Sequence, residues 1–344
     1  CPATGTATCT TKCIYPRPGT LPCPDTNFFG SNASGYATGS CSASGETSIG
    51  RLPWKTLGIE MLRDAYGEPL WYAVSDRFRR PGLTNAAINS DTVGTLKLYA
   101  PDGTTLLSPG GEELAAVIFS PGPPLAGQDR MAAPDDPASF LDSNAGLSNR
   151  NAAGPFVQGK VRDATGETVI NDQIAGISAK ELISTLEKRS LREAENALAA
   201  YAVANGGKYP NPASGNCNAL IANVNAPGVC ASDSTTCTGR LPEDALAGLA
   251  ARWFLANGWG RTTIYSVNKS NAMDSSGANC TTSLNVDGES RRYILIAPGT
   301  AKAAQNRPSP HLTDYLDDTV NSDAWSGNPD FTSPGAGSND QLRS

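Results

Sequence analysis

The sequence predicts an α+β fold in which one long helix and several short antiparallel strands are joined by long loops that disulfides brace. Three observations support this fold class: an amphipathic segment at 178–205, short alternating segments that follow turn residues, and cysteines placed in polar loops. A chain of 344 residues is long enough for two domains with cores of their own. We expect these domains at 1–177 and 178–344.

The segment 178–205 carries the start signal, the periodicity and the stop signal of a helix. Ser178 and Glu181 form a capping box, which satisfies N–H groups of the first turn. Gly206 supplies the left-handed residue that ends a helix, and Pro210 prevents it from resuming. Apolar residues share one face, which we expect to lie on the sheet of the second domain: Leu182, Leu186, Ala194, Ala197, Leu198 and Tyr201. The other faces are charged, through Lys180, Glu187, Lys188, Arg192 and Glu195.

Segments with alternating apolar and polar residues, each close to a turn signal, predict the strands. In the first domain they are 70–75, 94–99 and 115–120, and in the second domain the matching segment is 264–268. A short helical turn within 54–62 precedes the first of them. Each domain is therefore predicted to contain a small antiparallel sheet.

Seven short motifs occur twice, in one order and at nearly one spacing. The matched pairs are 50–53 with 239–242, 71–75 with 264–268, 117–122 with 294–299, 128–130 with 305–307, 139–142 with 314–317, Phe156 with Phe331, and 171–174 with 339–342. One shared tetrapeptide is easily a coincidence, but seven in register indicate a tandem duplication. The second copy starts with the helix and the first copy does not. We therefore expect an equivalent helix ahead of Cys1 in the full gene product.

Charge and hydropathy narrow the choice of partners. The net charge is −6 and no basic patch is visible, which argues against a nucleic-acid partner. No apolar run approaches the length of a membrane span. Contact with a membrane is therefore expected only through a segment upstream of Cys1.

The nine cysteines predict disulfides and an oxidising compartment. A zinc site would need paired cysteines or histidines at ligand spacing, whereas the chain has one C-x3-C and one histidine, His311. We expect a bridge between Cys23 and Cys41 in the first domain. Further bridges are expected within the second domain, among Cys217, Cys230, Cys237 and Cys280. The odd count leaves one thiol over, and Cys1 is the candidate because it lies at a terminus.

Signals for catalysis are weak. A catalytic triad would have to use His311, which lies in a Pro-rich loop and has no counterpart in the first copy. No G-x-S-x-G motif and no phosphate-binding loop occur. The adjacent acids 135–136 and 317–318 fit solvated loops better than a general acid and base, because neighbouring side chains diverge. We expect no catalytic residues and no enzyme.

Calcium is the one cofactor that the residues suggest. Asp142 and Asn144 place oxygen ligands two residues apart, with Gly146 following for the turn, and Asp25 and Asn27 repeat this spacing. The twelve-residue EF-hand pattern with its final Glu is absent, and Asx-turns account for the same residues without an ion. The five tryptophans are a further candidate, as a sugar-binding shelf, although core packing explains them equally: Trp54, Trp71, Trp253, Trp259 and Trp325.

Two groups of motifs carry a family resemblance. The helix contains 192–198 and Tyr201, and it ends in an N-G-x-Y-P motif at 205–210. The first domain contains Leu-Pro-Cys-Pro at 21–24, with G-R-L-P-W and D-A-Y-G further on. With a helix, then this motif, then a disulfide loop and a small sheet, the chain resembles the type IV pilin and type II secretion pseudopilin family. The resemblance implies two pilin-like modules in tandem, with other pilin or pseudopilin subunits as partners.

The chain departs from that family in two respects. The apolar Phe-Thr-Leu-x-Glu segment of prepilins is not present, and two modules in tandem are unusual for a major pilin. We therefore expect an extracellular minor pilin-like or pseudopilin-like component, or a tip subunit, that acts by assembly and binding. A surface-anchored adhesin or ligand-binding protein, with Cys1 lipid-modified, is the alternative, and a hydrolase that uses loop carboxylates is the third reading. The sequence ahead of Cys1 separates the first two, through either a prepilin helix or a lipobox.

Overall fold

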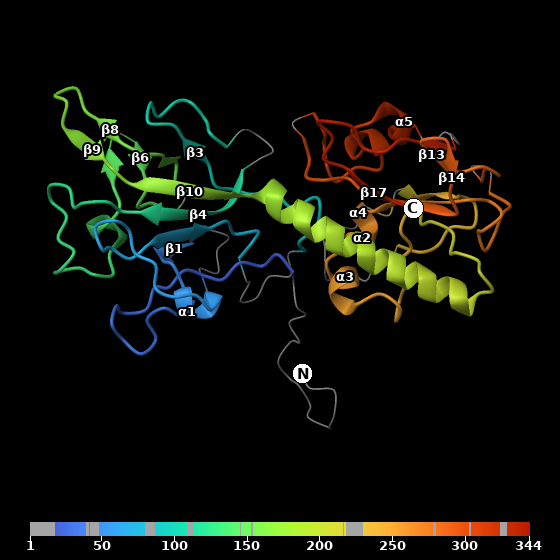
Figure 1. The fold of residues 1–344 in the computed structure, drawn as a ribbon, viewed down its shortest axis with the longest axis horizontal. Coiled ribbons are helices and arrows are strands. Elements are labelled where there is room, and N and C mark those ends of the chain that lie inside the picture. The colour runs from blue at the N-terminus through green and yellow to red at the C-terminus, as the bar shows by residue number, and fades with distance from the viewer. Residues whose placement is uncertain are drawn as a thin grey trace.

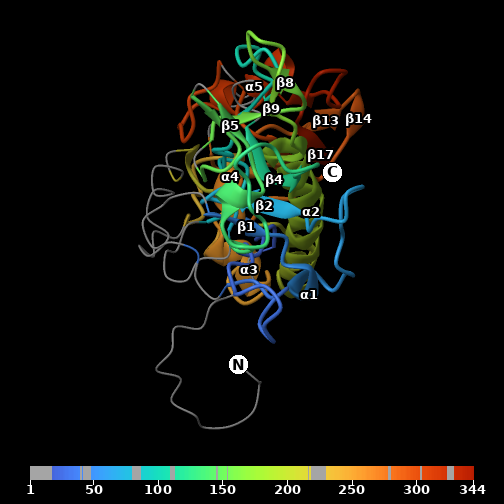
Figure 2. The same ribbon diagram turned by 90° about the vertical axis from the view of Figure 1, so that its left-hand side faces the viewer.

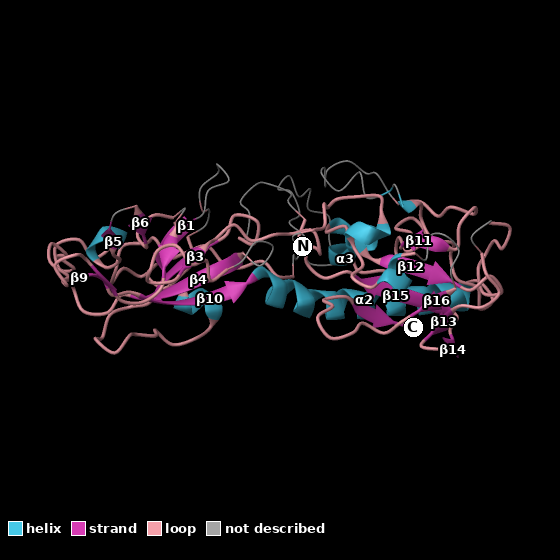
Figure 3. Cartoon of the chain, turned by 90° about the horizontal axis from the view of Figure 1, so that it is seen from above, coloured by secondary structure: helices cyan, strands magenta, loops and turns pink. Residues whose placement is uncertain are grey.

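The computed structural model describes most of the chain as a mixed α/β protein with antiparallel sheets and three disulfides (Figure 1). The described residues are 18–38, 41, 48–79, 87–108, 113–144, 146–152, 154–215, 217, 230–277, 280–302, 304–323 and 329–344. Seen from above, the two larger sheets lie end to end along the long axis, and the chain passes from one to the other through β10 (Gln173–Ser178) and α2 (Ala179–Ala204) (Figure 3).

Among the described residues, one helix is long and the other helical elements are short. They are α1 (Trp54–Leu57), α2 (Ala179–Ala204), α3 (Arg252–Ala256), α4 (Trp259–Thr262) and α5 (Thr319–Ser322), with the 3-10 turns η1 (Pro137–Ser139) and η3 (Leu312–Asp314). No helix among the described residues combines the length and the apolar composition that crossing a bilayer requires.

Two four-stranded antiparallel sheets form the framework. The first has the order β1-β2-β4-β10, from β1 (Ser48–Arg51), β2 (Trp71–Val74), β4 (Leu114–Ser120) and β10 (Gln173–Ser178). The second has the order β11-β12-β15-β17, from β11 (Thr238–Arg240), β12 (Ile264–Val267), β15 (Tyr293–Ala297) and β17 (Gln341–Arg343). The remaining short strands are β3 (Leu98–Tyr99), β5 (Ser143–Asn144), β6 (Leu147–Ser148), β7 (Phe156–Val157), β8 (Val161–Arg162), β9 (Thr168–Ile170), β13 (Asn285–Val286), β14 (Glu289–Ser290) and β16 (Asp330–Phe331).

The two sheets share their register as well as their strand order. Tyr72 lies opposite Gly50 on one side and Ile118 on the other. Tyr265, at the matching place of the second sheet, lies opposite Gly239 and Leu295. The last strands agree too, because Ala175 pairs with Ile118 as Arg343 pairs with Leu295. The predicted strands 70–75, 115–120 and 264–268 are therefore β2, β4 and β12, whereas most of 94–99 is irregular and only its end enters β3.

Close backbone contact explains why glycine opens the G-R-L-P motif in both halves. Asp25 and Arg51 exchange two backbone hydrogen bonds of 2.9 Å, and Ala213 and Arg240 exchange the equivalent pair. A Cβ atom on Gly50 would lie 2.7 Å from the Asp25 carbonyl oxygen, and one on Gly239 would collide with the Ala213 carbonyl oxygen. The segment before each motif can lie against the first strand only because the side chain is missing.

Helix α2 begins and ends where the sequence predicts. The Ser178 hydroxyl accepts from the Glu181 N–H at 3.1 Å, and Gly206 and Gly207 both have positive φ after the last turn. Its buried residues include Leu186, Ala194, Ala197 and Leu198, as expected.

The predicted contact face of α2 is wrong at several positions. Leu182 and Tyr201 are only half-buried, whereas Ile183, Leu191 and the expected outward Glu187 are buried. The reason is that α2 packs on more than one partner. The hydrophobic core around α2 includes residues of the second sheet and of α3, namely Leu295, Ala297 and Phe254. It also includes residues of the first half, namely Phe78, Ile88 and Ala115. A helix enclosed on several sides buries more than one stripe.

The disulfides lie within the halves. Cys23 is bonded to Cys41, Cys217 to Cys230 and Cys237 to Cys280, with Cα atoms 5.6, 5.3 and 4.8 Å apart. These are the six cysteines that the sequence singles out, and Cys1 lies outside the described residues. Three disulfides indicate an oxidising compartment and therefore an exported protein.

Candidate functional site: an open face of the first sheet

Corresponding faces of the two sheets differ in what covers them. Leu295 is fully buried in the core that α2 shares with the second sheet, whereas its counterpart Ile118 is only half-buried. In Figure 1, α2 crosses in front of the second sheet, and β4 and β10 have no long helix before them in the part of the chain that is described. Figure 2 shows β1, β2 and β4 facing the viewer, with α2 to one side of them.

We call the uncovered part of the first sheet the open face and define it by Leu70, Ile118, Ala175 and Ile177. These side chains lie on the same side of the sheet as Tyr72, because successive residues of a strand alternate between faces. Ala175 is exposed and the other three are half-buried. On the same side, Tyr72, Val74 and Ala116 are buried, with Leu21 packed against them. The four residues of the open face are all apolar, so this part of the side is an apolar surface that the fold leaves incomplete.

Three further apolar residues are exposed at the end of α1 and in the connection from α1 to β2: Leu57, Ile59 and Leu62, at 43, 41 and 49 % exposure. Of these, Leu62 lines a pocket together with Leu70 of the open face. The corresponding connection of the second half places Leu246, Trp253 and Phe254 against the core around α2. The connection before β12 therefore contacts α2 in the second half. The matching connection of the first half contains Leu57, Ile59 and Leu62.

In the first half, an acidic residue between α1 and β2 accepts a hydrogen bond that α2 accepts in the second half. In the second half, the Gly299 N–H donates to the carboxylate of Glu187 on α2. In the first half, the corresponding Gly122 N–H donates to Asp64 Oδ2 at 2.9 Å. Glu68 follows and forms an ion pair of 3.1 Å with Arg130. The connection therefore satisfies the polar groups at the end of β4 but leaves the apolar groups partly uncovered.

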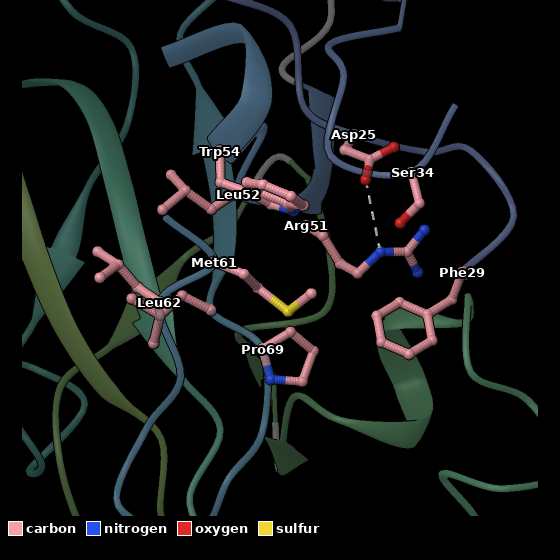
Figure 4. A pocket seen from close by; sticks show the side chains of 10 residues that line it. Asp25, Phe29, Ser34, Arg51, Leu52, Trp54, Met61, Leu62 and Pro69 are labelled. Carbon is pink, nitrogen blue, oxygen red and sulfur yellow. Dashed lines mark ion pairs between the residues drawn. The ribbon is translucent and has the colours of Figure 1, made fainter. Parts of the chain in front are cut away.

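A small pocket opens beside the open face, with which it shares Leu70 (Figure 4). Its walls are mainly apolar, from Phe29, Leu52, Trp54, Met61, Leu62, Pro69 and Leu70. Arg51 crosses the pocket in Figure 4, with Asp25 and Ser34 on one side and Phe29 on the other. The Arg51 side chain is 4 % exposed, and its Nη1 lies 2.6 Å from Asp135 Oδ1. Its Nε lies 3.8 Å from Asp25 Oδ2.

The pocket arginine has a counterpart that is enclosed. Arg240 is fully buried and stacks 4.0 Å from the ring centre of Tyr315. Burial lowers its pKa, although the neighbouring Tyr315 and Asp91 act in the opposite direction. Arg51 binds the Pro134 carbonyl at 3.1 Å, and Arg240 binds the Ser309 carbonyl at 3.1 Å. In both halves, the arginine of the G-R-L-P motif therefore connects its strand to a loop that is distant in the sequence.

The residues predicted to bind calcium lie in different settings. Asp142 is buried and accepts hydrogen bonds on both oxygens, from Gln128 Nε2 at 2.8 Å and from the Asn171 N–H at 2.7 Å. Asn144 is half-buried in β5, opposite Leu147. Asp25 accepts from the N–H groups of Asn27 and Gly35. No cluster of three His, Cys, Asp or Glu side chains suited to a metal occurs within the described ranges. Calcium binding stays a prediction.

The adjacent acids diverge, as the sequence predicts. Asp135 pairs with Arg51, while Asp136 caps η1 by accepting from the Ala138 N–H. Asp317 contacts Lys302 at 2.7 Å, while Asp318 caps α5.

The remaining singled-out residues are spread over the chain. His311 is exposed at the start of η3. Trp71 and Trp259 are buried, Trp54 and Trp253 are half-buried, and Trp325 lies outside the described residues. The tryptophans therefore form no common shelf among the described residues.

Several acids whose pKa burial raises were not recognised from the sequence. Burial raises the pKa of Glu187 to about 7 and that of Asp172 to about 8, where the nearby Asp142 charge adds to the effect. Burial raises the pKa of Asp340 to about 7. Asp91 also has a raised pKa from burial, against the pull of Arg307 and Arg240. A signal existed for two of them, because Asp172 and Asp340 belong to the repeated Asn-Asp-Gln motif.

No protein-family model, no curated protein and no solved structure matches the chain at a significant level.

Proposed function

We propose that the protein is an extracellular minor pilin-like or pseudopilin-like subunit, built by duplication of one module, which acts by assembly with other such subunits at the bacterial cell surface. The observation that carries this proposal is the difference between the matched sheets, since α2 covers one of them and the corresponding face of the other is only partly covered. The shared strand order and register support the duplication. The occupant that fits the open face is an amphipathic helix of the α2 kind, donated by a neighbouring subunit.

The polar contacts of α2 indicate how such a helix would be held. On the second sheet, Glu195 of α2 pairs with Arg343 at 2.6 Å. Gln341 donates to Glu187 at 3.2 Å and to the Ser184 carbonyl at 2.9 Å. The first sheet keeps the glutamine as the exposed Gln173, but it has Ala175 in place of Arg343. A helix on the open face would therefore keep the amide contact and lack the ion pair.

A labelled synthetic peptide of residues 178–205, titrated against the whole protein and followed by fluorescence anisotropy, tests the proposal. We expect saturable binding that Ala175→Asp weakens at least tenfold, because a charge would face the apolar side of the peptide. Val203→Asp is the matched control, since Val203 is 87 % exposed on the outer side of α2. Equal affinity of both variants would contradict the proposal.

A gain of affinity makes the test sharper. Ala175→Arg recreates the Arg343 position, so the peptide should bind several-fold more tightly. A peptide with Glu195→Gln should lose that gain, because it lacks the acid that pairs with Arg343 on the second sheet.

The pocket favours a second candidate, a ligand-binding or adhesive surface protein. Apolar walls around a buried Arg51 leave room for one small apolar group of a ligand at most. In that case Met61→Arg, which fills the pocket, should abolish adhesion and leave the binding of the helix peptide unchanged.

A further inference from the structure

Two matched glycines, which follow β4 and β15, obtain their acidic partner from different parts of the chain. The Gly299 N–H donates to Glu187 of α2. The Gly122 N–H donates to Asp64 Oδ2, at 2.9 Å, in the connection from α1 to β2. The first half therefore already contains, without a helix, the carboxylate that α2 supplies to the second half.

Asp64 lies on the same side of the first sheet as the open face. Ile118 and Ser120 are two positions apart in β4, so their side chains point to one side of the sheet. The Ser120 hydroxyl donates to Asp64 Oδ2 at 3.5 Å. This is the side that α2 covers in the second half, where Leu295 takes the place of Ile118. A helix docked on the open face would therefore meet Asp64 at one end of that face.

Asp64 brings a negative charge to this end, held by hydrogen bonds from neutral groups. Its Oδ1 accepts from the N–H groups of Tyr66 and Glu68, at 2.8 and 2.9 Å. Arg130 lies nearby, but it forms its 3.1 Å ion pair with Glu68. The positive charge of the arginine is thus matched by Glu68, and the carboxylate of Asp64 is a further negative charge beside the apolar surface.

The two sheets thus differ at both positions where α2 makes a charged contact. On the second sheet, Glu187 supplies the acid at the end of β15, and Glu195 pairs with Arg343 at 2.6 Å. On the first sheet, Asp64 replaces the acid of the helix, and Ala175 stands at the position of Arg343. A helix that lay on the open face as α2 lies on the second sheet would meet a negative group at the first position and an apolar residue at the second.

We propose that the open face selects a helix with a lysine or arginine at the position of Glu187 and an uncharged residue at the position of Glu195. This inference rests on the proposed function and names the chemistry of the partner helix in it. A glutamate at the first position would find the Gly122 N–H already bonded to Asp64 and would face a like charge, whereas a basic side chain would pair with that carboxylate. A glutamate at the second position would lose water against Ala175 and gain no partner.

The same basic residue would be unfavourable on the second sheet. Glu187 is fully buried there, and its carboxylate accepts from Ser90 Oγ at 2.6 Å and from Gln341 Nε2 at 3.2 Å. A lysine in its place would bury a positive charge among hydrogen-bond donors. The two sheets therefore discriminate between helices by repulsion as well as by attraction, and the effect of a lysine on affinity reports which sheet a helix has bound.

Labelled peptides of residues 178–205, titrated against the whole protein by fluorescence anisotropy, test the inference. The unchanged peptide is compared with its Glu187→Gln and Glu187→Lys variants, and we expect the affinity to rise in that order, by about fivefold to tenfold from the first to the last. The gain should shrink at high salt, because it comes from ion pairing. A Glu187→Lys peptide that binds no more tightly than the unchanged one would overturn the inference and leave the proposed function in place. Absence of binding by all three peptides would contradict both.

Variants of the protein assign the effect to Asp64. Asp64→Asn keeps an acceptor oxygen and removes the charge, so the Glu187→Lys peptide should lose its advantage over the unchanged peptide. Glu167→Gln is the matched control, because it removes the same charge from the exposed turn between β8 and β9, and the advantage should persist. Circular dichroism establishes that both variants fold, and the salt dependence in the unaltered protein decides the question if Asp64→Asn does not fold. An equal advantage in both variants would contradict the role of Asp64.

Discussion

Ile118 and Leu295 hold the same position in two sheets of identical register, but Leu295 is fully buried and Ile118 is not. The backbone around them is the same, so the difference comes from the third layer. In the second half that layer is α2, and in the first half it is a connection that ends in Asp64 and Glu68. In this unmatched layer, an interaction with another chain would bury apolar side chains that the fold leaves partly exposed.

The inner face of α2 contributes more to stability than its outer face. Leu198 is fully buried in the core shared with the second sheet, and Lys188 is exposed on the same helix. We expect Leu198→Ala to lower the free energy of unfolding by about 2–5 kcal/mol. Lys188→Ala should change it by about 0.5 kcal/mol or less. Urea denaturation of both variants measures the difference, and equal shifts would contradict the observed packing.

The first glycine of each G-R-L-P motif is needed for packing against the preceding segment. Gly50→Ala would bring a methyl group 2.7 Å from the Asp25 carbonyl oxygen, so we expect a loss of about 1–3 kcal/mol. Gly335→Ala is the matched control, because nothing lies within 4 Å of its added methyl group. Thermal melts in which the control loses as much stability as Gly50→Ala would show that the contact is not the cause.

Several helices and strands could be predicted from hydrophobic periodicity and from the residues that start or end such elements. The ends of α2 follow from a capping box and a Gly-Gly stop, and β2 and β12 follow from alternation beside turns. These signals lie within a few residues of each element, so they can be recognised without knowledge of the tertiary fold. The segment 94–99 was predicted less well, since Leu98 and Tyr99 pair with β7 far along the chain and Leu96 forms only an isolated bridge with Leu114.

The buried acids could not be predicted, because their surroundings come from distant segments. Glu187 looks like a surface residue by helical periodicity. In the structure Ser90, from the first half, donates to it at 2.6 Å, and Gln341, from the C-terminal strand, donates at 3.2 Å. Asp91 reaches the second half in the same way, accepting from Tyr315 at 3.3 Å. Such contacts join residues more than 90 positions apart and leave no trace in local spacing.

The disulfide between Cys23 and Cys41 should stabilise the first half because it lowers the conformational entropy of the unfolded chain. The bonded residues are 18 positions apart, and closing a loop of this length contributes about 3 kcal/mol in the chain-entropy model. We expect the double variant Cys23→Ser with Cys41→Ser to lose about this much in urea denaturation. The pair Cys217→Ser and Cys230→Ser, 13 positions apart, should lose a similar amount. Unchanged midpoints in both double variants would argue against these bridges.

Glu187 should make the joint between the two halves sensitive to pH. It is fully buried, and its carboxylate accepts from Ser90 of the first half and from Gln341 of the second. Burial raises its pKa from 4.5 to about 7. The native state therefore keeps a proton that the unfolded chain releases, and the contribution of this group to stability falls as the pH rises from about 4.5 to about 7. A shift of this size corresponds to about 3 kcal/mol.

Glu187→Gln removes that dependence, because the amide cannot ionise. The variant should be slightly less stable than the wild type at pH 4.5, where the protonated acid fits best, and as stable or more stable at pH 8. Denaturation curves at several pH values, compared with the exposed control Glu60→Gln, measure the difference. A constant gap between Glu187→Gln and the wild type at every pH would mean that Glu187 titrates alike in the folded and unfolded chains. In that case the native carboxylate would be ionised above about pH 4.5, as in the unfolded chain, with Arg307 nearby to balance its charge.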